Sequence, residues 1–278
     1  MNKSKVWYVT GASQGLGLIL VKKLLAGGYR VAATSRNVQK LKEGVGVYDT
    51  ERFLPIAADL NNEDCIDESV RQTLSAFGQI DVVVNNAGYG MAGTVEETST
   101  EDYRKLFDVN VLAALNVVKR VLPVLREQRT GYIINIGSVA GFSGAPGWSY
   151  YSATKAALTA FTEVLALDVK EFGIKATIVE PSGFRTGFLT KESLAYTESR
   201  IEGYQAVKDT MQRYLAADGK QAGDPDKAAE ILIELAEKEN PPLHLYLGQD
   251  AYKRASLKLA EMTAELETWK SYTISADY

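Results

Sequence analysis

The sequence predicts an α/β protein built on a doubly wound, parallel sheet of seven strands. Short runs rich in β-branched residues alternate with longer segments of helical spacing along most of the 278 residues. The early runs lack apolar–polar alternation, as expected for parallel strands that helices cover on both faces. The gaps between runs, about 20 residues or more, are long enough for crossover helices.

The seven strands and the connecting segments can be placed along the chain. The strands are expected at residues 6–10, 30–34, 53–57, 81–85, 132–136, 175–179 and 243–247. Residues 182–224 carry no predicted strand but many aromatic and charged residues, and an insertion of this length is typical of a substrate lid or a partly disordered loop. Residues 250–269 have helical spacing and are expected to pack as a C-terminal helix within an extension at 250–278.

Composition and charge narrow the class of protein. Hydrophobic residues at 46% and charged residues at 24% are ordinary for a globular domain. No repeat, low-complexity tract or linker divides the chain, so a single domain over residues 1–278 is expected. The net charge of −4 lacks the basic field that nucleic-acid binding requires, and no nucleic-acid partner is expected.

Cysteine and histidine are each present once, as Cys65 and His244. This excludes an internal disulfide and the usual zinc sites, so no metal is expected. A hydrolase triad would have to use His244, and no Gly-x-Ser-x-Gly motif accompanies it. No apolar run approaches the roughly 18 residues of a membrane span, and the start lacks the apolar core of a signal peptide. The expected location is therefore cytoplasmic, with no membrane partner.

A glycine-rich turn follows the first predicted strand, in the order Thr10, Gly11, Ala12, Ser13, Gln14, Gly15, Leu16 and Gly17. Glycines in such a turn let the backbone approach a pyrophosphate, and the N-terminus of the next helix supplies N–H donors. The Gly-x-x-x-Gly-x-Gly spacing is not the usual dinucleotide fingerprint. An ordinary strand-to-helix turn therefore stays open as an alternative.

Ser35 and Arg36 end the second predicted strand, where NAD-specific folds place an acidic residue on the ribose 2′-hydroxyl. The acid is absent here. The Arg36 guanidinium can instead pair with a 2′-phosphate, which points to NADP(H). The alternative is a surface arginine that caps the next helix.

Tyr151 and Lys155 are spaced to share one face of a predicted helix. A nearby ammonium lowers the pKa of a phenol, which favours proton exchange with a carbonyl or an alcohol. Tyr204 and Lys208 repeat the spacing. Tyr151, however, follows Ser138 at the end of the fifth predicted strand, where open α/β sheets bind ligands. The Tyr204 pair has no such partner and is interpreted as a coincidence on a solvated helix.

Together these residues resemble the short-chain dehydrogenase/reductase family. The marks occur in family order over residues 5–250: Thr10-Gly11-x-x-x-Gly15-x-Gly17, Asp59-Leu60, Asn85-Asn86-Ala87-Gly88, Asn110, Ser138 and Tyr151-x-x-x-Lys155. The resemblance implies a Rossmann fold in which Tyr151 is the general acid/base and Ser138 hydrogen-bonds the substrate oxygen. It also implies that Lys155 holds the nicotinamide ribose and lowers the pKa of Tyr151, and that Asn110 positions a proton-relay water.

The resemblance also implies a set of cofactor contacts. They are Thr10, Gly11, Ser13, Gln14, Gly15, Leu16 and Gly17 in the first turn, Ser35 and Arg36, Asp59 and Leu60 at the adenine edge, Asn86, Ala87 and Gly88 along the ribose, Tyr151 and Lys155, and Pro181, Gly183 and Thr186 beside the nicotinamide. Asp59 could instead cap the next helix, and Asn110 could be a buried polar residue. Ser182 stands where the family usually has Gly, which makes the local path beside the nicotinamide less defined.

The sequence thus predicts an oxidoreductase that moves a hydride between NADP(H) and a carbonyl or secondary alcohol. The alternatives are a non-catalytic NADP-binding regulatory protein and, less favoured, a methyltransferase. Apolar residues near the motifs predict a bulky apolar substrate, unless those of the lid only pack it down; they are Tyr89, Met91, Phe142, Trp148, Phe184, Phe188, Leu189 and Tyr196. The resemblance implies a homodimer or homotetramer through the helices after Thr100 and Tyr151, unless the tail after Asp250 blocks one contact.

Overall fold

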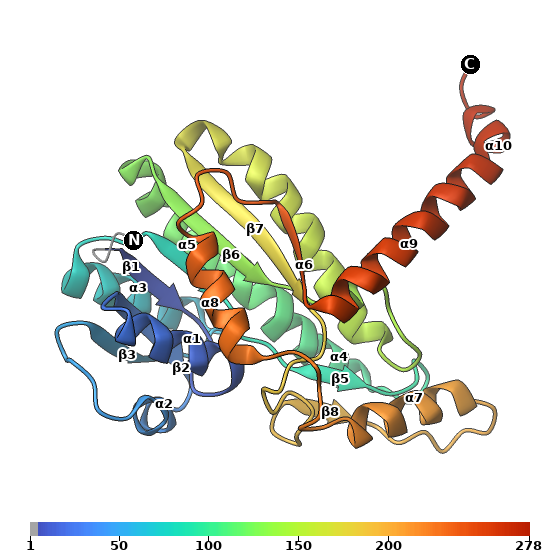
Figure 1. Ribbon diagram of the computed structural model, residues 1–278, viewed down its shortest axis with the longest axis horizontal. Helices are drawn as coiled ribbons and strands as arrows, with labels where there is room; N and C mark the ends of the chain where they lie inside the picture. The colour runs from blue at the N-terminus through green and yellow to red at the C-terminus, as the bar shows by residue number, and fades with distance from the viewer. Residues whose placement is uncertain (1–4) are drawn as a thin grey trace.

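The computed structural model describes residues 5–278 and contains the predicted sheet (Figure 1). Seven parallel strands lie in the order β3-β2-β1-β4-β6-β7-β9. Their bounds are β1 Val6–Val9, β2 Arg30–Ser35, β3 Phe53–Ala57, β4 Val82–Asn85, β6 Gly131–Ile136, β7 Ile174–Pro181 and β9 His244–Leu247. Each predicted run overlaps one of them, so the predicted fold class is confirmed. The strand order reverses between β1 and β4, the position at which open sheets of this kind bind ligands.

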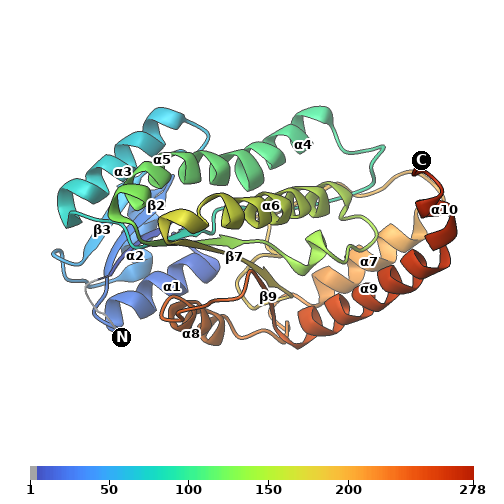
Figure 2. The ribbon, with the colours of Figure 1, turned by 90° about the horizontal axis from the view of Figure 1, so that it is seen from above.

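Two layers of helices cover the sheet, as Figure 2 shows. One face carries α1 (Gly15–Ala26), α2 (Val38–Val45) and α8 (Pro225–Leu235), and the other carries α3 (Glu63–Phe77), α4 (Thr100–Phe107), α5 (Ala113–Gln128) and α6 (Ser149–Asp168). Neighbouring residues of β1 face opposite layers: Trp7 packs with Leu20 of α1, and Tyr8 packs with Val117 of α5. Both are fully buried, which explains why the strands lack polar positions.

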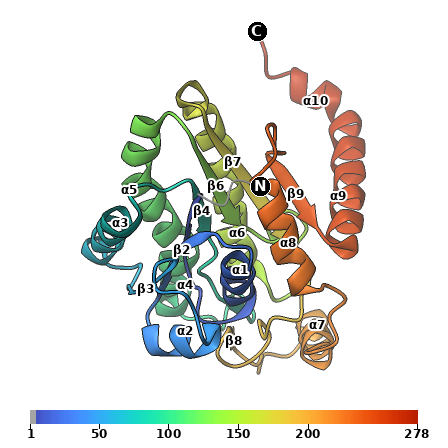
Figure 3. The same ribbon diagram turned by 60° about the vertical axis from the view of Figure 1, so that its left-hand side comes forward.

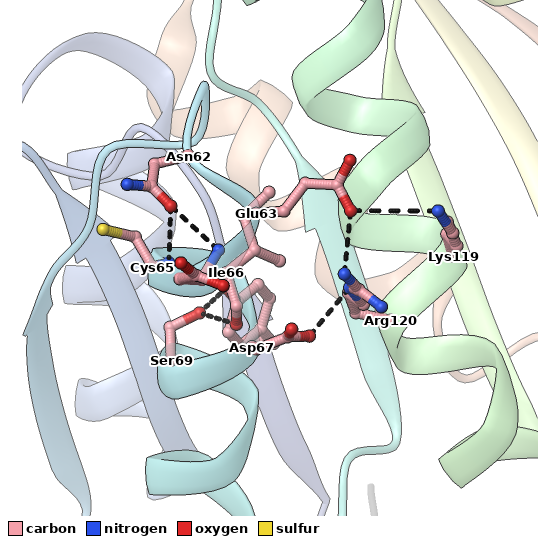
Figure 4. Close-up of polar contacts among 10 residues, drawn as sticks. Asn62, Glu63, Cys65, Ile66, Asp67, Ser69, Lys119 and Arg120 are labelled. Atoms are coloured by element: carbon pink, nitrogen blue, oxygen red, sulfur yellow. Dashed lines mark hydrogen bonds and ion pairs between the residues drawn. The ribbon is translucent and has the colours of Figure 1, made fainter.

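Ion pairs join α3 and α5 on the outer surface (Figure 4). The Asn62 side chain accepts hydrogen bonds from the first turn of α3, and Arg120 of α5 then contacts Glu63 at 2.8 Å and Asp67 at 2.7 Å. Exposed pairs of this kind contribute about 1 kcal/mol or less each. The pairs therefore add little to the stability of the fold.

The segment 182–224 corrects the prediction that it carries no strand. Its β8 (Leu194–Tyr196) pairs in parallel with β5 (Gly90–Ala92), followed by α7 (Gln205–Ala216). A strand of three residues is too short to give a periodic signal, and its partner is more than a hundred residues away in the sequence. The pairing anchors the lid beside the turn that follows β4.

The C-terminal helix forms as predicted, but its predicted packing is wrong beyond the first turns. The helix α9 (Gln249–Thr268) and the short α10 (Lys270–Ile274) run away from the body in Figure 1. Only Ala251 and Ala255 of α9 are buried. Three short helical turns complete the described chain, at η1 (Asp108–Leu112), η2 (Val139–Gly141) and η3 (Lys170–Phe172). No helix within residues 5–278 is long and apolar enough to cross a membrane.

Candidate active site

A cleft of about 2190 Å³ opens along the carboxyl ends of the central strands and extends under the lid. Most of the predicted site residues line it: Gly11, Ser13, Gln14, Gly15, Leu16, Ser35, Arg36, Asp59, Leu60, Asn86, Ala87, Gly88, Ser138, Tyr151, Lys155, Pro181, Gly183 and Thr186. Thr10, Gly17 and Asn110 do not. The fold therefore brings motifs from seven separate stretches of sequence into one continuous cleft.

Thr10 and Gly17 shape the walls of the cleft from behind. The Thr10 hydroxyl accepts hydrogen bonds from the backbone N–H groups of Asn86, at 3.0 Å, and Ala87, at 3.1 Å. The Asn86 amide in turn donates to the carbonyls of Thr10 and Gly11. A Cβ atom on Gly17 would lie only 2.4 Å from this amide. These residues lock the turn after β1 to the turn after β4.

The glycine-rich turn leaves the N-terminus of α1 open to the cleft. Gly11 has a φ of +64°, and a Cβ atom there would lie 2.6 Å from the Cα of Ala87, so only glycine fits. Gln14 precedes the helix but its side chain makes no capping hydrogen bond, and the first turn holds no acidic residue. The free N–H groups and the positive end of the helix dipole suit an anion such as a pyrophosphate.

Arg36 and Asp59 are both free for a ligand, because neither caps a helix. Asn37 caps α2 by accepting from the N–H of Lys40 at 2.9 Å, and Asn62 caps α3. Arg36 is exposed, with no hydrogen-bond or ion-pair partner within residues 5–278. The Asp59 carboxylate accepts one hydrogen bond within residues 5–278, from the backbone N–H of Asn61. The helix-capping alternatives for these two residues do not hold.

Ser138, Tyr151 and Lys155 meet at the carboxyl end of β6. The Ser138 hydroxyl accepts from the N–H of Ala140 at 3.1 Å, which fixes it at the start of η2. Tyr151 and Lys155 lie one turn apart on α6 and are 6% and 5% exposed. The Lys155 ammonium donates to the carbonyl of Ile136 at 2.8 Å and lies 5.8 Å from the centre of the Tyr151 ring. The three side chains form one compact polar group.

Burial dominates the electrostatics of this group. Burial raises the pKa of Tyr151 to about 12, and hydrogen bonding by Ser138 opposes the rise. Burial also lowers the pKa of Lys155 to about 8. The net shift is thus upward, opposite to the lowered pKa that the sequence predicts, because desolvation of the buried phenolate dominates; the lowering contribution of Lys155 itself stays a prediction. At neutral pH Tyr151 retains its proton.

Asn110 lies in the π-helical turn η1, and its side chain is fully used by the protein. Its amide oxygen accepts from the N–H of Tyr89 at 3.0 Å, and its nitrogen donates to the Tyr89 carbonyl at 2.9 Å and to the Thr154 hydroxyl at 3.2 Å. The residue is 1% exposed. This geometry is that of a buried residue that positions the loop before β5, and a water-positioning role for Asn110 stays a prediction.

Aromatic side chains line the part of the cleft next to Tyr151. Of the predicted apolar set, Tyr89, Trp148, Phe184, Phe188 and Leu189 line it, and Met91, Phe142 and Tyr196 do not. Ring centres of Trp148 and Phe188 lie 5.5 and 5.7 Å from that of Tyr151. Tyr214 of α7 also lines the cleft and was not predicted; its only signal was helical spacing from the buried Met211. Residues 5–278 contain no cluster of three or more His, Cys, Asp or Glu side chains suited to a metal ion.

Sequence comparisons agree with this geometry. A family model described as short chain dehydrogenase matches residues 5–196. The oxidoreductase BOA17 of Botryotinia fuckeliana is 35% identical over 274 residues, 98% of this chain and 99% of that protein. A 3-ketodihydrosphingosine reductase of Bacteroides thetaiotaomicron is 32% identical over 240 residues, 86% of each.

Solved structures extend the similarity to the whole fold. A short-chain dehydrogenase from Streptomyces avermitilis superposes with a TM-score of 0.90 at 37% identity, covering 98% of this chain and all of that one. ElxO with NADP bound has a TM-score of 0.70 at 25% identity, covering 87% and 95%. A 3-ketoacyl-(acyl-carrier-protein) reductase from Brucella melitensis, complexed with NADH, shares the fold at 21% identity, with a TM-score of 0.71 and coverage of 87% and 95%. Neighbours with this fold thus bind either nicotinamide cofactor.

Proposed function

The chain belongs to the short chain dehydrogenase family of oxidoreductases, and we propose that it transfers a hydride between NADP(H) and a carbonyl group or a secondary alcohol. One observation carries the proposal. Ser138, Tyr151 and Lys155 meet in the same cleft that receives the open N-terminus of α1 and the unpaired Arg36. The N-terminus of α1, Arg36 and Lys155 would hold a nicotinamide cofactor, and Ser138 and Tyr151 would serve the substrate in the same cleft.

The side chains divide the chemistry between them. NADP(H), when bound, supplies or accepts the hydride. Tyr151 holds its proton at neutral pH and donates it to the substrate oxygen during reduction. The Ser138 hydroxyl hydrogen-bonds that oxygen and orients it toward Tyr151. The Lys155 cation, 5.8 Å from the ring centre, stabilises the phenolate that the transfer leaves behind.

Arg36 supports a preference for the phosphorylated cofactor. Arg36 directly follows β2, at the position where an acidic residue would repel a 2′-phosphate, and no described carboxylate forms an ion pair with its guanidinium. A charge-assisted hydrogen bond contributes roughly 1.5 to 3 kcal/mol, or about 10- to 100-fold in affinity for NADPH over NADH. Arg36→Ala is expected to remove most of this preference by weakening NADPH binding and leaving NADH binding unchanged.

Fluorescence titration of both cofactors measures this preference directly. Lys42→Ala is the matched control, because Lys42 is an exposed cation on α2 that does not line the cleft. It should leave the ratio of the two dissociation constants as it is in the wild type. Equal dissociation constants for NADPH and NADH in the wild type would refute the role of Arg36.

The cleft wall favours a bulky apolar substrate. Trp148, Phe188 and Leu189 pack in one apolar cluster with Tyr151, and Phe184 also lines the cleft; burial of apolar surface contributes about 25 cal/mol per Å². The Bacteroides relative, named for a 3-keto substrate, is consistent with a ketone. We expect kcat/KM to rise with apolar size along a series of ketones measured with NADPH. A flat profile would favour the alternative in which these residues only pack the lid.

The main competing function is a regulatory protein that binds NADP(H) without turnover. The complete set of Ser138, Tyr151 and Lys155 argues against it, because cofactor binding alone does not require their arrangement. A broad panel of aldehydes, ketones and alcohols separates the two functions by the change in NADPH absorbance. Tight cofactor binding with no turnover on any member would favour the regulator.

The homodimer or homotetramer that the resemblance implies is also part of the proposal. Leu112, next to α5, and Val164 and Leu167 of α6 are 49%, 56% and 74% exposed, on the helices expected to meet a second subunit. Apolar exposure of this kind is typical of an interface.

A further inference from the structure

A buried carboxyl group lies directly behind the catalytic residues. Glu180 is the second-last residue of β7, the strand between β6 and β9 (Figure 3), and its side chain is fully buried. It does not line the cleft. The charged side chain that faces it within residues 5–278 is His244 of β9, which lies between Glu180 and Glu163 of α6. Because a carboxyl is costly to bury, the contacts that satisfy it indicate its role.

Glu180 closes a ring of contacts behind the cleft. Its Oε1 atom lies 3.2 Å from the Thr159 hydroxyl, which donates to the carbonyl of Lys155 at 3.0 Å. The Lys155 ammonium donates to the carbonyl of Ile136, and Gly137 is the next residue. Gly137 packs against Glu180, since a Cβ atom there would lie 3.3 Å from the Glu180 Cγ. The ring therefore joins β6, α6 and β7.

The ring reaches the backbone of two catalytic residues. Gly137 directly precedes Ser138, and the contact through Thr159 fixes the turn of α6 that carries Lys155. Burial and the nearby Glu180 carboxyl raise the pKa of Tyr246 to about 12. Catalysis is sensitive to such alignment, because a shift of about 1 Å can lower a rate by roughly 100-fold.

The hydrogen-bond geometry favours a proton on Glu180. The Thr159 hydroxyl has a single hydrogen, and the carbonyl of Lys155 can only accept it, so the contact with Oε1 requires a hydrogen from the carboxyl. His244 does not supply one: its Nδ1 lies 3.7 Å from Oε2, and neither atom has a hydrogen-bond partner in the described part of the chain. Burial also raises the pKa of Glu180, and the contacts with His244, Thr159 and Tyr246 oppose the rise.

We propose that Glu180 is a positioning residue, which as a neutral carboxylic acid keeps Ser138 and Lys155 aligned for hydride transfer. It acts through Gly137 and Thr159 and contacts no reacting atom. The inference rests on the proposed function, because the ring has a catalytic role only if the cleft catalyses a reaction. Glutamine is the matched replacement, since its amide supplies one donor group and one acceptor in the shape of the neutral acid.

Steady-state kinetics of the full-length protein tests the positioning. Glu180→Ala should lower kcat by about 10- to 100-fold, because the ring opens beside Gly137, while KM and the Kd for NADPH change by less than about threefold. Glu180→Gln should restore kcat to within about threefold of the wild type. Thr159→Val should lower kcat by about 3- to 10-fold, and Thr159→Ser should restore it. The Thr159 pair carries the test if Glu180→Ala does not fold.

Thr177→Val is the control that separates positioning from stability. Thr177 is a fully buried residue nearer the start of β7, and its hydroxyl contacts that of Tyr132 and donates to the carbonyl of Pro242, both at 2.6 Å. It does not line the cleft. Its replacement should lower the melting temperature and leave kcat unchanged. Thermal melting of every variant verifies that it folds.

Infrared difference spectroscopy tests the protonation of Glu180 without any turnover. The spectrum of the wild type minus that of Glu180→Gln, at pH 7, should contain the C=O stretching band of a protonated carboxylic acid. A spectrum with carboxylate bands alone would show that Glu180 is ionised, and would overturn the neutral form. A Glu180→Gln variant as slow as Glu180→Ala would overturn it as well.

Two kinetic results would overturn the positioning role and leave the proposed function intact. The first is a kcat within about threefold of the wild type in both Glu180→Ala and Thr159→Val. The second is an equal loss of kcat in Thr177→Val, which would assign the effect to general destabilisation. A wild type that turns over no carbonyl or alcohol would instead refute the proposed function, and the positioning role with it.

Discussion

The chain contains the Tyr-x-x-x-Lys spacing twice, on α6 and at the start of α7, and the two pairs differ in their burial and in the residues around them. On α6, Tyr151 and Lys155 are almost fully buried and stand beside Ser138 at the end of β6. In the lid, the Tyr204 hydroxyl donates a hydrogen bond to the Glu96 carboxylate, and the Lys208 ammonium donates one to the carbonyl of Ile201 at 3.3 Å.

The pKa of the phenol does not separate these two regions. Burial raises the pKa of Tyr151, and the hydrogen bond to Glu96 raises the pKa of Tyr204. What separates them is the neighbourhood that the sheet supplies, namely a serine hydroxyl, a cleft and a lysine whose pKa burial lowers to about 8. The Tyr-x-x-x-Lys motif of α6 is thus suited to proton transfer because it lies over the carboxyl end of β6, where Ser138 and the cleft are found.

The largest expected effect comes from removing the two phenol hydroxyls in turn. Tyr151→Phe should lower kcat by about 10²- to 10⁴-fold, because a proton donor at the substrate oxygen is lost while the ring keeps its packing. NADPH affinity should change little. Steady-state kinetics on any established substrate measures the loss.

Tyr204→Phe is the matched control and should leave the chemical step unchanged. If Tyr151→Phe retained turnover within about threefold of the wild type, the assignment of the proton donor to α6 would be wrong. A loss of similar size in both variants would mean that the two regions act together.

The two lysines are expected to differ in their effect on stability. Lys155→Met should stabilise the cofactor-free protein by about 1 to 3 kcal/mol at pH 7, because it removes a buried cation at the cost of one hydrogen bond that cleft water can replace. Below pH 8, Lys155 is charged in both the folded and the unfolded chain, so the whole gain is present. As the pH rises from 8 toward 10.5 the folded protein loses the proton first, the wild type gains stability and the gap closes.

Urea unfolding at neutral pH and at about pH 10 measures both parts of this prediction. Lys208→Met serves as the control, since Lys208 is only partly buried in the lid. A Lys155→Met variant less stable than the wild type at neutral pH would show that the contact with Ile136 outweighs the desolvation of the ammonium.

The comparison also indicates which parts of the molecule the sequence could predict. The seven strands and the gathering of the motifs were predictable, because parallel strands buried on both faces leave a continuous apolar signal and their carboxyl ends share one edge. The place of Ser138 next to Tyr151 followed from that edge. On spacing alone, the pair of Tyr204 and Lys208 would be predicted to be as catalytic as the pair of Tyr151 and Lys155.

The errors fall where distant residues decide the structure. β8 has three residues and exists through its pairing with β5. The pKa of Tyr151 depends on burial by Trp148 and Phe188, which come from other segments. The packing of α9 was mispredicted because an apolar stripe does not reveal how much of it the rest of the chain covers. Each of these features depends on contacts between segments that lie far apart in the sequence.

The smallest expected effect concerns two aromatic residues of the lid, one inside the cleft and one outside it. The ring of Phe188 lies 5.7 Å from that of Tyr151, whereas Tyr196 is 37% exposed and does not line the cleft. Phe188→Ala should lower kcat/KM for bulky apolar ketones by about 5- to 30-fold, since roughly 1 to 2 kcal/mol of apolar contact is lost. The loss should shrink as the ketone becomes smaller, because a short side chain does not reach the ring. Tyr196→Ala should leave the whole series unchanged. An equal loss for large and small ketones would mean that Phe188 holds the lid in place over Tyr151 and contributes nothing to substrate selection.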